Sequence, residues 1–292
     1  MTVNPTSHEI GFIGLGIMGQ NMAGHLQKAG YKLHVYNRTK AKADALVAGG
    51  AKWCPTPGEV AANSDVVITM VGYPSDVEEV YLGSDGIIKN AKKGAYLIDM
   101  TTSEPSLAVR IAEAAAANGL HALDAPVSGG EGGAINGTLS IMVGGTQDAF
   151  DAVKPLFDIM GENIRLQGGP GAGQHTKMSN QIVIASTMMG VAEGLKYAIK
   201  SGLNPEEVLK SIGTGAASSF LLNGLGPKMI EGDFAPGFFV HHFIKDMTIA
   251  LKEADAMGAD LQGLRTAKGL YEKISENGAR EDGTQALIKA YK

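Results

Sequence analysis

The sequence predicts a doubly wound α/β sheet over residues 1–168 and an all-helical half over residues 169–292. Short β-rich runs alternate with helical stretches up to the glycine-rich segment QGGPGAGQ, and no further strand-like run follows it. The chain of 292 residues also exceeds the usual size of a single hydrophobic core. We therefore expect two domains with different secondary structure.

The first half contains seven strand-like runs. In order they are IGFIGLG, KLHVYNR, DVVITMV, AYLIDMT, HALDAPVS, LSIMVGG and NIRLQG. Stretches such as MGQNMAGHLQKAG and PSLAVRIAEAAAANG separate them, carry apolar residues at helical spacing and end at glycine, as helix C-termini often do. Alternation of this kind predicts a parallel sheet with crossover helices on both faces.

The second half begins with a long helix over about residues 172–200, which connects the two domains and is apolar on most sides. Four more helical stretches follow, NPEEVLKSIG, SSFLLNGLGPKMIEG, HFIKDMTIALKEADAMG and LRTAKGLYEKISENG, each bounded by glycine or proline. A helix that is apolar on most sides is buried. Because one chain of this size offers too little surface to cover it, we expect a homodimer or homotetramer.

Composition excludes several classes of partner. Hydrophobic residues make up 44% and charged residues 19%, and the net charge of −5 gives no general attraction to nucleic acid or to an anionic membrane. No apolar run reaches the length of about 18 residues that spans a bilayer. The N-terminus MTVNPTSHE does not resemble a signal peptide, and Cys54 is the only cysteine. We expect a cytoplasmic protein with a buried, inert thiol.

The stretch GFIGLGIMG, residues 11–19, joins the first strand to the first helix. A GxGxxG pattern in this context is typical of a Rossmann domain, where the first glycine makes the turn, the second admits a pyrophosphate and the third allows close helix packing. The alternative is a purely structural turn. The predicted pyrophosphate-binding residues are Gly14, Leu15, Gly16, Ile17, Met18 and Gly19.

The second strand ends in Asn37, Arg38 and Thr39, where an acidic residue would bind an adenosine ribose 2′-hydroxyl. An acidic side chain would repel a 2′-phosphate, whereas a guanidinium binds it through two hydrogen bonds. We therefore expect NADP(H) to be preferred, with NAD(H) possible. The alternative is that Arg38 is a solvated surface charge.

Lys177 lies early in the long helix, with Asn180 and Gln181 three and four positions later on the same face. Reduction of a carbonyl by hydride needs a proton donor near the oxygen, and burial lowers the pKa of a lysine toward the range suited to proton transfer. Lys177 is therefore a candidate catalytic residue. From the residues alone, a lysine that extends its ammonium to solvent is equally compatible with this position.

Four separated blocks carry a resemblance over nearly the whole chain: GFIGLGIMG, DAPVSGGEGGAINGTLSIMVGG, GAGQHTKMSNQ and HFIKDMTIAL. In content, order and spacing they resemble the β-hydroxyacid dehydrogenase family. This family includes 3-hydroxyisobutyrate dehydrogenases, tartronate semialdehyde reductases and plant-type glyoxylate/succinic semialdehyde reductases. The resemblance implies hydride transfer between NAD(P)(H) and a small 3-hydroxy acid or semialdehyde.

The resemblance also assigns roles to residues. It implies that Lys177 is the catalytic general acid/base, and that Asn180 and Gln181 contact the substrate. The substrate carboxylate would bind the turn of Ser128, Gly129 and Gly130, whose backbone N–H groups can hold an anion. The implied cofactor contacts are Val71, Gly72, Asp76, Thr101, Thr102 and Lys245. Without the resemblance, Lys245 and Asp246 predict a solvated pair on a helix, and the serine-glycine-glycine segment predicts a plain turn.

Two positions depart from common family patterns. Many members have Leu-Pro where this chain has Val71-Gly72, so this loop is expected to be looser. Many also have asparagine at the position of Gln181, and KMSNQ resembles instead the tartronate semialdehyde reductase branch. The exact substrate contacts therefore do not follow from the resemblance alone.

Three other interpretations are less favoured. His241 and His242 are adjacent, so their side chains point in different directions on a helix, and no third ligand stands at a suitable spacing; no metal site is expected. An imine reductase of the same architecture is disfavoured because similar imine reductases usually lack the lysine. A non-catalytic nucleotide-binding sensor is disfavoured because Lys177, the Ser128 turn and Lys245 are all present.

Overall fold

The structure is a computed structural model that describes residues 2–292, and it divides into two compact units. One unit ends at Lys177 and contains all the named strands, and the other comprises Met178–Lys292 and is helical. The long helix α9 (Ala172–Lys200) begins in the first unit and continues into the second. The predicted fold class is confirmed, with a change of secondary structure where the sequence predicts it.

The first unit is built on a nine-stranded sheet with the order β3-β2-β1-β4-β5-β6-β8-β7, and β9 also pairs with β8. The strands are β1 (Glu9–Ile13), β2 (Lys32–Tyr36), β3 (Lys52–Trp53), β4 (Val66–Thr69), β5 (Tyr96–Asp99), β6 (His121–Asp124), β7 (Val127–Ser128), β8 (Leu139–Gly144) and β9 (Gly161–Gly168). Strands β1 to β3 are added in one direction along the sheet, and β4 to β6 are added in the other direction, starting on the other side of β1. In open α/β sheets, ligands bind in the crevice that this reversal creates at the carboxyl ends of the strands.

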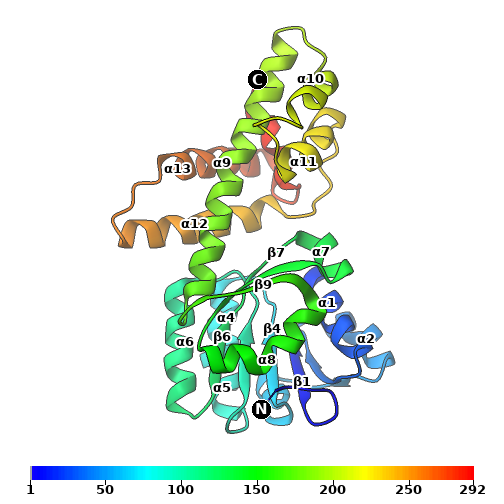
Figure 1. Cartoon of the computed structure of the whole chain (residues 1–292), viewed down its shortest axis with the longest axis vertical. Helices are drawn as coiled ribbons and strands as arrows, with labels where there is room; N and C mark the ends of the chain where they lie inside the picture. Colours follow the sequence, from blue (N-terminus) through cyan, green and yellow to red (C-terminus); the bar gives the residue numbers. More distant parts are fainter. Residues whose placement is uncertain (1) are drawn as a thin grey trace. The chain divides into compact units, whose positions relative to one another are not determined.

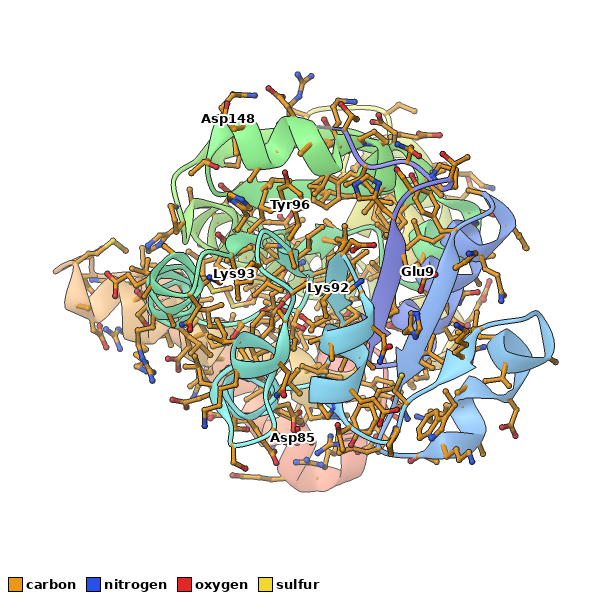
Figure 2. All side chains as sticks on the ribbon, turned by 90° about the horizontal axis from the view of Figure 1, so that it is seen from below. Glu9, Asp85, Lys92, Lys93, Tyr96 and Asp148 are labelled. Carbon is orange, nitrogen blue, oxygen red and sulfur yellow. The ribbon has the colours of Figure 1, made fainter. Side chains whose placement is uncertain are left out.

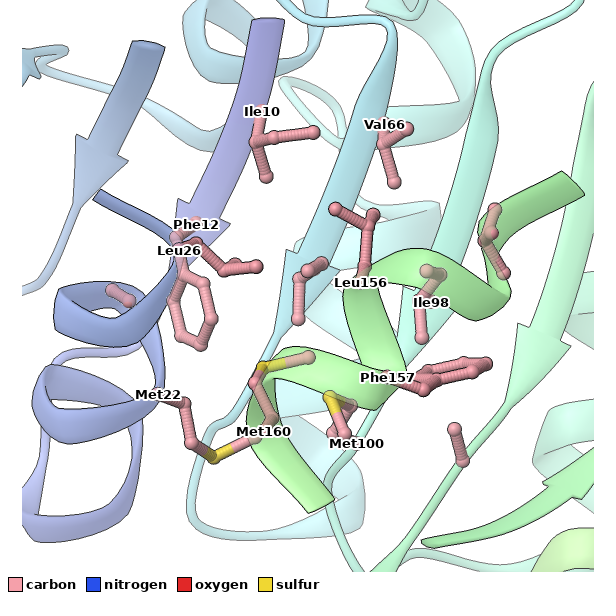
Figure 3. Packing of buried hydrophobic residues seen from close by; sticks show 14 of the residues in the cluster. Ile10, Phe12, Met22, Leu26, Val66, Ile98, Met100, Leu156, Phe157 and Met160 are labelled. Atoms are coloured by element: carbon pink, nitrogen blue, oxygen red, sulfur yellow. The ribbon is translucent and has the colours of Figure 1, made fainter. Parts of the chain in front are cut away.

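Alternating side chains of the strands enter two hydrophobic cores, one on each face of the sheet. On β4, Val66 and Ile68 face one core and Val67 faces the other, as expected for the two-residue period of a strand. The first core includes side chains of β1, α1 (Ile17–Lys28) and α8 (Gln147–Met160), and Figure 3 shows Phe12, Met22 and Phe157 in it. Both faces are covered, so the central strands β1, β4, β5 and β6 are mainly apolar between their ends.

The remaining helical segments of this unit lie between the strands or flank the sheet. They are η1 (Lys40–Ala43), α2 (Asp44–Ala48), α3 (Pro57–Asn63), α4 (Pro74–Leu82), α5 (Ile87–Asn90), α6 (Pro105–Ala117) and α7 (Gly130–Asn136). The second core, on the opposite face, contains side chains of α3, α4 and α6 together with Cys54. Burial raises the pKa of the Cys54 thiol.

The sheet differs from the prediction at one side, because β8 runs antiparallel to β6 and β7. Only β1 to β6 form the parallel part, and β9 is parallel to β8. The residues between Asp124 and Leu139 form β7, a turn and the short α7, which allow a direct reversal and need no crossover helix. The two-residue strands β3 and β7 are too short to leave a periodic pattern of their own.

The unit Met178–Lys292 contains the rest of α9 and the helices α10 (Pro205–Ile212), α11 (Phe220–Glu231), α12 (Val240–Ala256) and α13 (Gln262–Ile274). All four were predicted, and Figure 1 shows them beside α9 in yellow to orange. Two short segments follow, a π-type turn η2 (Ser275–Ala279) and a 3-10 helix η3 (Thr284–Ala290). Phe243 of α12 and Tyr271 of α13 meet edge to face, with ring centroids 5.0 Å apart, in the core of this unit.

By length and hydropathy alone, α9 is long and apolar enough to cross a membrane, with a mean hydropathy of 1.3 over 18 residues. The prediction that no apolar run is long enough to span a bilayer therefore does not hold for α9, in which polar residues alternate with many apolar ones. Core helices of globular proteins pass the same test. The helix is only partly covered, because 33% of that window is buried.

Candidate active site

The glycine turn after β1 has the geometry that a dinucleotide site requires. Gly14 has φ +95°, and a Cβ there would collide with the carbonyl oxygen of Met70. A Cβ at Gly19 would collide with the carbonyl oxygen of Gly14, so helix α1 lies directly on the turn. At Gly16, the N-terminal cap of α1, an added Cβ would meet no heavy atom within 4 Å, so its surroundings are open. The first and third glycines therefore serve close packing, and the second leaves space for a ligand.

The end of β2 carries a hydrogen-bonded amide, Asn37, and an exposed guanidinium, Arg38. Asn37 Oδ1 accepts a hydrogen bond from the Leu15 N–H at 2.9 Å, and its Nδ2 donates to the Thr39 carbonyl at 2.9 Å. Asn37 therefore holds the glycine turn in place. The side chain of Arg38 is 76% exposed and its Nη1 lies 3.0 Å from Asp76 Oδ1. This ion pair links the end of β2 to the first turn of α4.

The loops after β4 and β5 are joined by hydrogen bonds. The Val71 N–H donates to Thr101 Oγ1 at 3.0 Å, and the Thr101 N–H donates to Asp99 Oδ1 at 3.1 Å. Gly72 and Thr102 follow in these loops and are partly exposed. Because β1, β2, β4 and β5 are parallel, the loops that follow them lie at the same edge of the sheet. Figure 2 views the opposite edge, where Glu9 and Tyr96 begin β1 and β5.

Asp99, the last residue of β5, has a buried carboxyl group whose pKa is raised. Burial raises its pKa from 3.8 to about 6, and the negative charge of the neighbouring Asp124 adds to the rise. Hydrogen bonds from Thr101 and Thr69 act in the opposite direction, and the Thr69 hydroxyl donates to Asp99 Oδ1 at 2.8 Å. Asp99 therefore fixes the start of the Thr101 loop.

The serine-glycine-glycine turn lies beyond the carboxyl end of β6. Asp124 pairs with Gly144 and Ser128 pairs with Ser140 along the same strand β8, so β7 continues the direction of β6 past its end. Gly129 has φ +130° and Gly130 has φ +61°, values that side-chain-bearing residues rarely adopt. Both glycines are exposed. The turn therefore presents backbone on the same side of the sheet as the glycine turn.

The predicted catalytic lysine lies on a helix whose first turn is anchored to the sheet. Asp124 Oδ1 accepts the Gly171 N–H and Asp124 Oδ2 accepts the Gln174 N–H, both at 2.8 Å. Lys177 follows three residues after Gln174 and is 7% exposed. The interpretation of Lys177 as a side chain that reaches bulk solvent is therefore wrong. The catalytic role of Lys177 stays a prediction.

In the helical unit, the predicted residues form a chain of polar contacts around one buried carboxylate. Asn180 Nδ2 donates to Gln181 Oε1 at 2.7 Å, and Gln181 Nε2 donates to Asp246 Oδ2 at 2.6 Å. Lys245 Nζ lies 3.2 Å from Asp246 Oδ1, with side chains only 12% and 2% exposed. The solvated pair that the residues alone predict at Lys245 and Asp246 is therefore wrong. Helix α12 buries this pair together with its apolar face.

The two adjacent histidines lie at the start of α12 among aromatic rings. Their ring centroids are 4.2 Å apart, and His241 Nδ1 is 3.1 Å from the Arg280 carbonyl oxygen. Burial lowers the pKa of His242 to about 4, and the positive charges of His241 and Lys245 add to this effect. His242 is thus neutral at pH 7. Within residues 2–292, no group of three or more histidine, cysteine or acidic side chains is arranged to hold a metal ion.

Comparison with known proteins places this geometry in a family. Residues 9–169 match the model of the NAD binding domain of 6-phosphogluconate dehydrogenase, and residues 171–291 match the NAD-binding domain of NADP-dependent 3-hydroxyisobutyrate dehydrogenase. The chain is 42% identical over 282 residues to 2-hydroxy-3-oxopropionate reductase of Escherichia coli, covering 97% of this chain and 96% of that protein. The chain belongs to the β-hydroxyacid dehydrogenase family. It is an oxidoreductase with an NAD(P)-binding domain.

Two further members of the family are close in sequence or structure. An uncharacterized oxidoreductase of Bacillus subtilis, YkwC, is 60% identical over 282 residues, which cover 97% of this chain and 98% of that protein. The 3-hydroxyisobutyrate dehydrogenase of Mycobacterium tuberculosis, solved with L-serine, superposes with a TM-score of 0.89 at 29% identity. That comparison covers 97% of this chain and 98% of the other. Fold and family therefore agree over nearly the whole length.

The glycine turn fits the dinucleotide that the family binds. The open space at Gly16 lies at the N-terminus of α1, where unpaired N–H groups favour an anion such as a pyrophosphate. The predicted cofactor residues Leu15, Ile17 and Met18 belong to the same turn and first helical residues. Val71, Gly72, Thr101 and Thr102 lie at the same edge of the sheet.

Sequence reasoning missed four polar residues that organise these loops. Asp99, Asp124, Gln174 and Asp246 are each buried and hydrogen-bonded or ion-paired. A signal was present for the first two, because each is an acidic residue at the end of an otherwise apolar strand, in YLID and HALD. Gln174 and Asp246 left no such signal, because the side-chain hydrogen bonds that hold them join residues 65 to 73 positions apart in the sequence.

Proposed function

We propose that this protein is an NADP(H)-dependent reductase of small carbonyl acids, which interconverts a semialdehyde and the corresponding 3-hydroxy acid with Lys177 as general acid/base. One observation carries the proposal. The glycine turn, the Thr101 loop, the serine-glycine-glycine turn and the anchored start of α9 all lie at the carboxyl side of one sheet. This arrangement supports a single site for dinucleotide, carboxylate and proton donor.

The end of β2 supports a preference for NADP(H). Arg38 is exposed and β2 ends without an acidic residue, so a 2′-phosphate would meet a guanidinium with free space around it. Asp76 orients this guanidinium through the 3.0 Å ion pair. A phosphate carries more negative charge than the carboxylate and forms bidentate hydrogen bonds with arginine, so it can share the guanidinium with Asp76. Thr39 adds a hydroxyl group beside it.

The proposed chemistry assigns one task to each part of the site. When bound, the nicotinamide supplies a hydride to the carbonyl carbon or accepts it in the reverse direction. Lys177 donates a proton to the carbonyl oxygen during reduction and takes it back during oxidation. The backbone at Ser128, Gly129 and Gly130 holds the substrate carboxylate, because its two left-handed glycines leave N–H groups accessible. Asn180 and Gln181 orient the substrate.

The substrate class follows from the site and the relatives together. A carboxylate site and a nearby general acid suit a short acid with an aldehyde or hydroxyl group a few atoms away. 2-Hydroxy-3-oxopropionate, named for the Escherichia coli relative, is such a molecule, and L-serine, present in the mycobacterial structure, is a 3-hydroxy acid. We therefore propose tartronate semialdehyde and methylmalonate semialdehyde, whose reduction gives 3-hydroxy acids, as the first candidates. Succinic semialdehyde and glyoxylate complete the panel, and their reduction gives a 4-hydroxy and a 2-hydroxy acid.

Purified protein tested with this panel decides the proposal. Oxidation of NADPH and of NADH is followed by absorbance with each carbonyl acid, and each substrate is paired with an analogue that lacks the carboxylate. We expect turnover with at least one acid, faster with NADPH, and little turnover with the matched analogue. Absence of turnover with every acid, or equal turnover with the analogues, would contradict the proposed function.

We further propose that the protein is a homodimer or homotetramer. On α9, Val183, Gly190, Gly194 and Tyr197 are spaced by seven, four and three residues, so they lie on one face of the helix. Val183 is 65% and Tyr197 is 76% exposed, and the two glycines have open space around them. An apolar face that allows close approach of another helix supports burial against a second copy of the chain.

A further inference from the structure

The first turn of α9 is held by an acidic side chain from the sheet. Asp124 is 4% exposed, and its two carboxylate oxygens accept the N–H groups of Gly171 and Gln174 at 2.8 Å. N–H groups at the start of a helix have no partners within the helix, and they carry a partial positive charge. Asp124 therefore acts as a cap that comes from strand β6, 47 and 50 residues earlier in the sequence.

A second anchor runs from the helix to the loop after β5. Gln174 is fully buried, and both ends of its amide are used. Its Oε1 accepts the Ser103 N–H at 3.0 Å and its Nε2 donates to the Thr101 carbonyl at 2.7 Å. The two bonds run in opposite directions, so the amide has one allowed orientation. Because Thr101 also binds the Val71 N–H, the helix is tied to both loops that are expected to face the cofactor.

Two glycines bring the helix into direct backbone contact with the sheet. A Cβ at Gly173 would collide with the Met142 carbonyl and lie 2.6 Å from the Asp124 carbonyl oxygen. A Cβ at Gly144, on β8, would lie 2.7 Å from the Gly173 nitrogen. The start of α9 therefore has no room to shift toward the sheet, and the hydrogen bonds of Asp124 and Gln174 keep it from moving away.

These contacts end one turn before Lys177. An α-helix rises 1.5 Å per residue, so a residue three positions after Gln174 is about 4.5 Å further along the axis and moves with the anchored turn. A displacement of about 1 Å in a reacting group can reduce a rate by about 100-fold. We propose that Gln174 and Asp124 are positioning residues, which set the place of the Lys177 ammonium for proton transfer. This inference rests on the proposed function of Lys177.

The test uses Gln174→Met, which keeps the length of the side chain and removes both hydrogen bonds of its amide. The matched control is Gln27→Met, because Gln27 lies in the same unit and its amide donates one hydrogen bond, to the Leu46 carbonyl at 2.9 Å, far along α1 from the glycine turn. Asp124→Asn keeps one carbonyl acceptor, loses the charge and places an NH2 group, which cannot accept a hydrogen bond, against one of the two N–H groups. All are studied as full-length protein with the substrate found for the parent.

We expect kcat of Gln174→Met to fall about 10 to 100-fold while Kd for NADPH changes less than about 2-fold. The kinetic isotope effect on kcat with NADPH deuterated at the transferred position should rise, because misplacement slows the chemical step. A loss of folded enzyme would lower kcat without changing the isotope effect. Asp124→Asn should change kcat and the isotope effect in the same direction as Gln174→Met. Gln27→Met should retain the kcat and isotope effect of the parent.

Amide hydrogen exchange over residues 171–178 gives a readout that does not need activity. Faster exchange there in Gln174→Met than in the parent supports the anchor, and unchanged exchange overturns it. An unchanged kcat, or a reduced kcat with the isotope effect of the parent, overturns the positioning role. A parent without turnover on the whole panel contradicts the proposed function itself and with it the role of Lys177, whereas the exchange experiment then still decides whether Gln174 anchors the helix.

Discussion

Replacement of Asp99 by asparagine should make the stability of the sheet unit much less dependent on pH. Burial raises the pKa of Asp99 from 3.8 to about 6, so the folded protein holds this proton more tightly than the unfolded chain. The contribution of Asp99 to stability is therefore greatest at low pH and falls as the pH rises from about 4 to about 6. Asparagine keeps the shape and an oxygen acceptor for Thr69 and Thr101, and it does not titrate.

The size of the change in unfolding free energy follows from the rise in the pKa of Asp99. A rise of about two pKa units corresponds to about 3 kcal/mol between the fully protonated and fully ionised states. About 2 kcal/mol of this falls between pH 4.5 and pH 7. The difference in unfolding free energy between Asp99→Asn and the parent should therefore grow by about 2 kcal/mol in favour of the variant over this range.

Urea unfolding at several pH values measures this difference. Trp53 is the only tryptophan and lies on β3, so its fluorescence reports the unit that contains Asp99. Asp148→Asn, which removes an exposed carboxyl group on α8 of the same unit, controls for the loss of one negative charge. The reasoning would be refuted if the difference in unfolding free energy between Asp99→Asn and the parent stayed constant from pH 4.5 to pH 7.

Two further predictions concern the cofactor and the assembly. We expect the parent to prefer NADPH over NADH in kcat/KM by about 10 to 150-fold, since one charge-assisted contact supplies about 1.5 to 3 kcal/mol. Arg38→Asp should reverse this preference. Equal use of both cofactors by the parent would remove Arg38 from this role. Light scattering should find a dimer or tetramer, and Tyr197→Glu, which places a charge at a side chain that is 76% exposed, should shift it to smaller species. A parent that is monomeric at all concentrations would reject the proposed interface.

The spacing of glycines and of apolar residues predicted the fold well, because tight turns and buried helix faces each require particular residues at fixed spacing. The glycine motif predicted a tight turn at Gly14 and close helix packing at Gly19, and the positive φ of Gly14 and the collision that a Cβ would cause at Gly19 agree with it. The helices of the second half were also predicted, because each has an apolar face and a glycine or proline boundary. Strand β8 was predicted, but its antiparallel direction was not, since periodicity indicates that a strand exists and not how it pairs.

The predicted cofactor residues of the sheet unit lie in the turns and loops after β1, β2, β4 and β5 or in the first turn of the helix that follows, whereas Asn180, Gln181 and Lys245 lie inside α9 and α12. The partners of these residues were not predictable. Asn37 carries the pattern of a cofactor contact, and its amide in the structure braces the glycine turn. Asp246 stands beside Lys245 and predicts an exposed pair, yet the core of the helical unit buries it. Contacts between residues tens of positions apart, such as Gln174 with Ser103, depend on how elements assemble and leave no spacing in the sequence.

The most direct test of the account is the turnover of Lys177→Met with NADPH and a carbonyl acid that the parent reduces. Methionine has nearly the length of lysine and suits a position that is 7% exposed, so folding should be retained. NADPH binding, followed by energy transfer from Trp53, should be unchanged. We expect kcat to fall by about 100 to 10,000-fold because the proton donor is lost. A kcat close to that of the parent, in a variant that binds NADPH normally, would contradict the assignment of Lys177 as general acid/base.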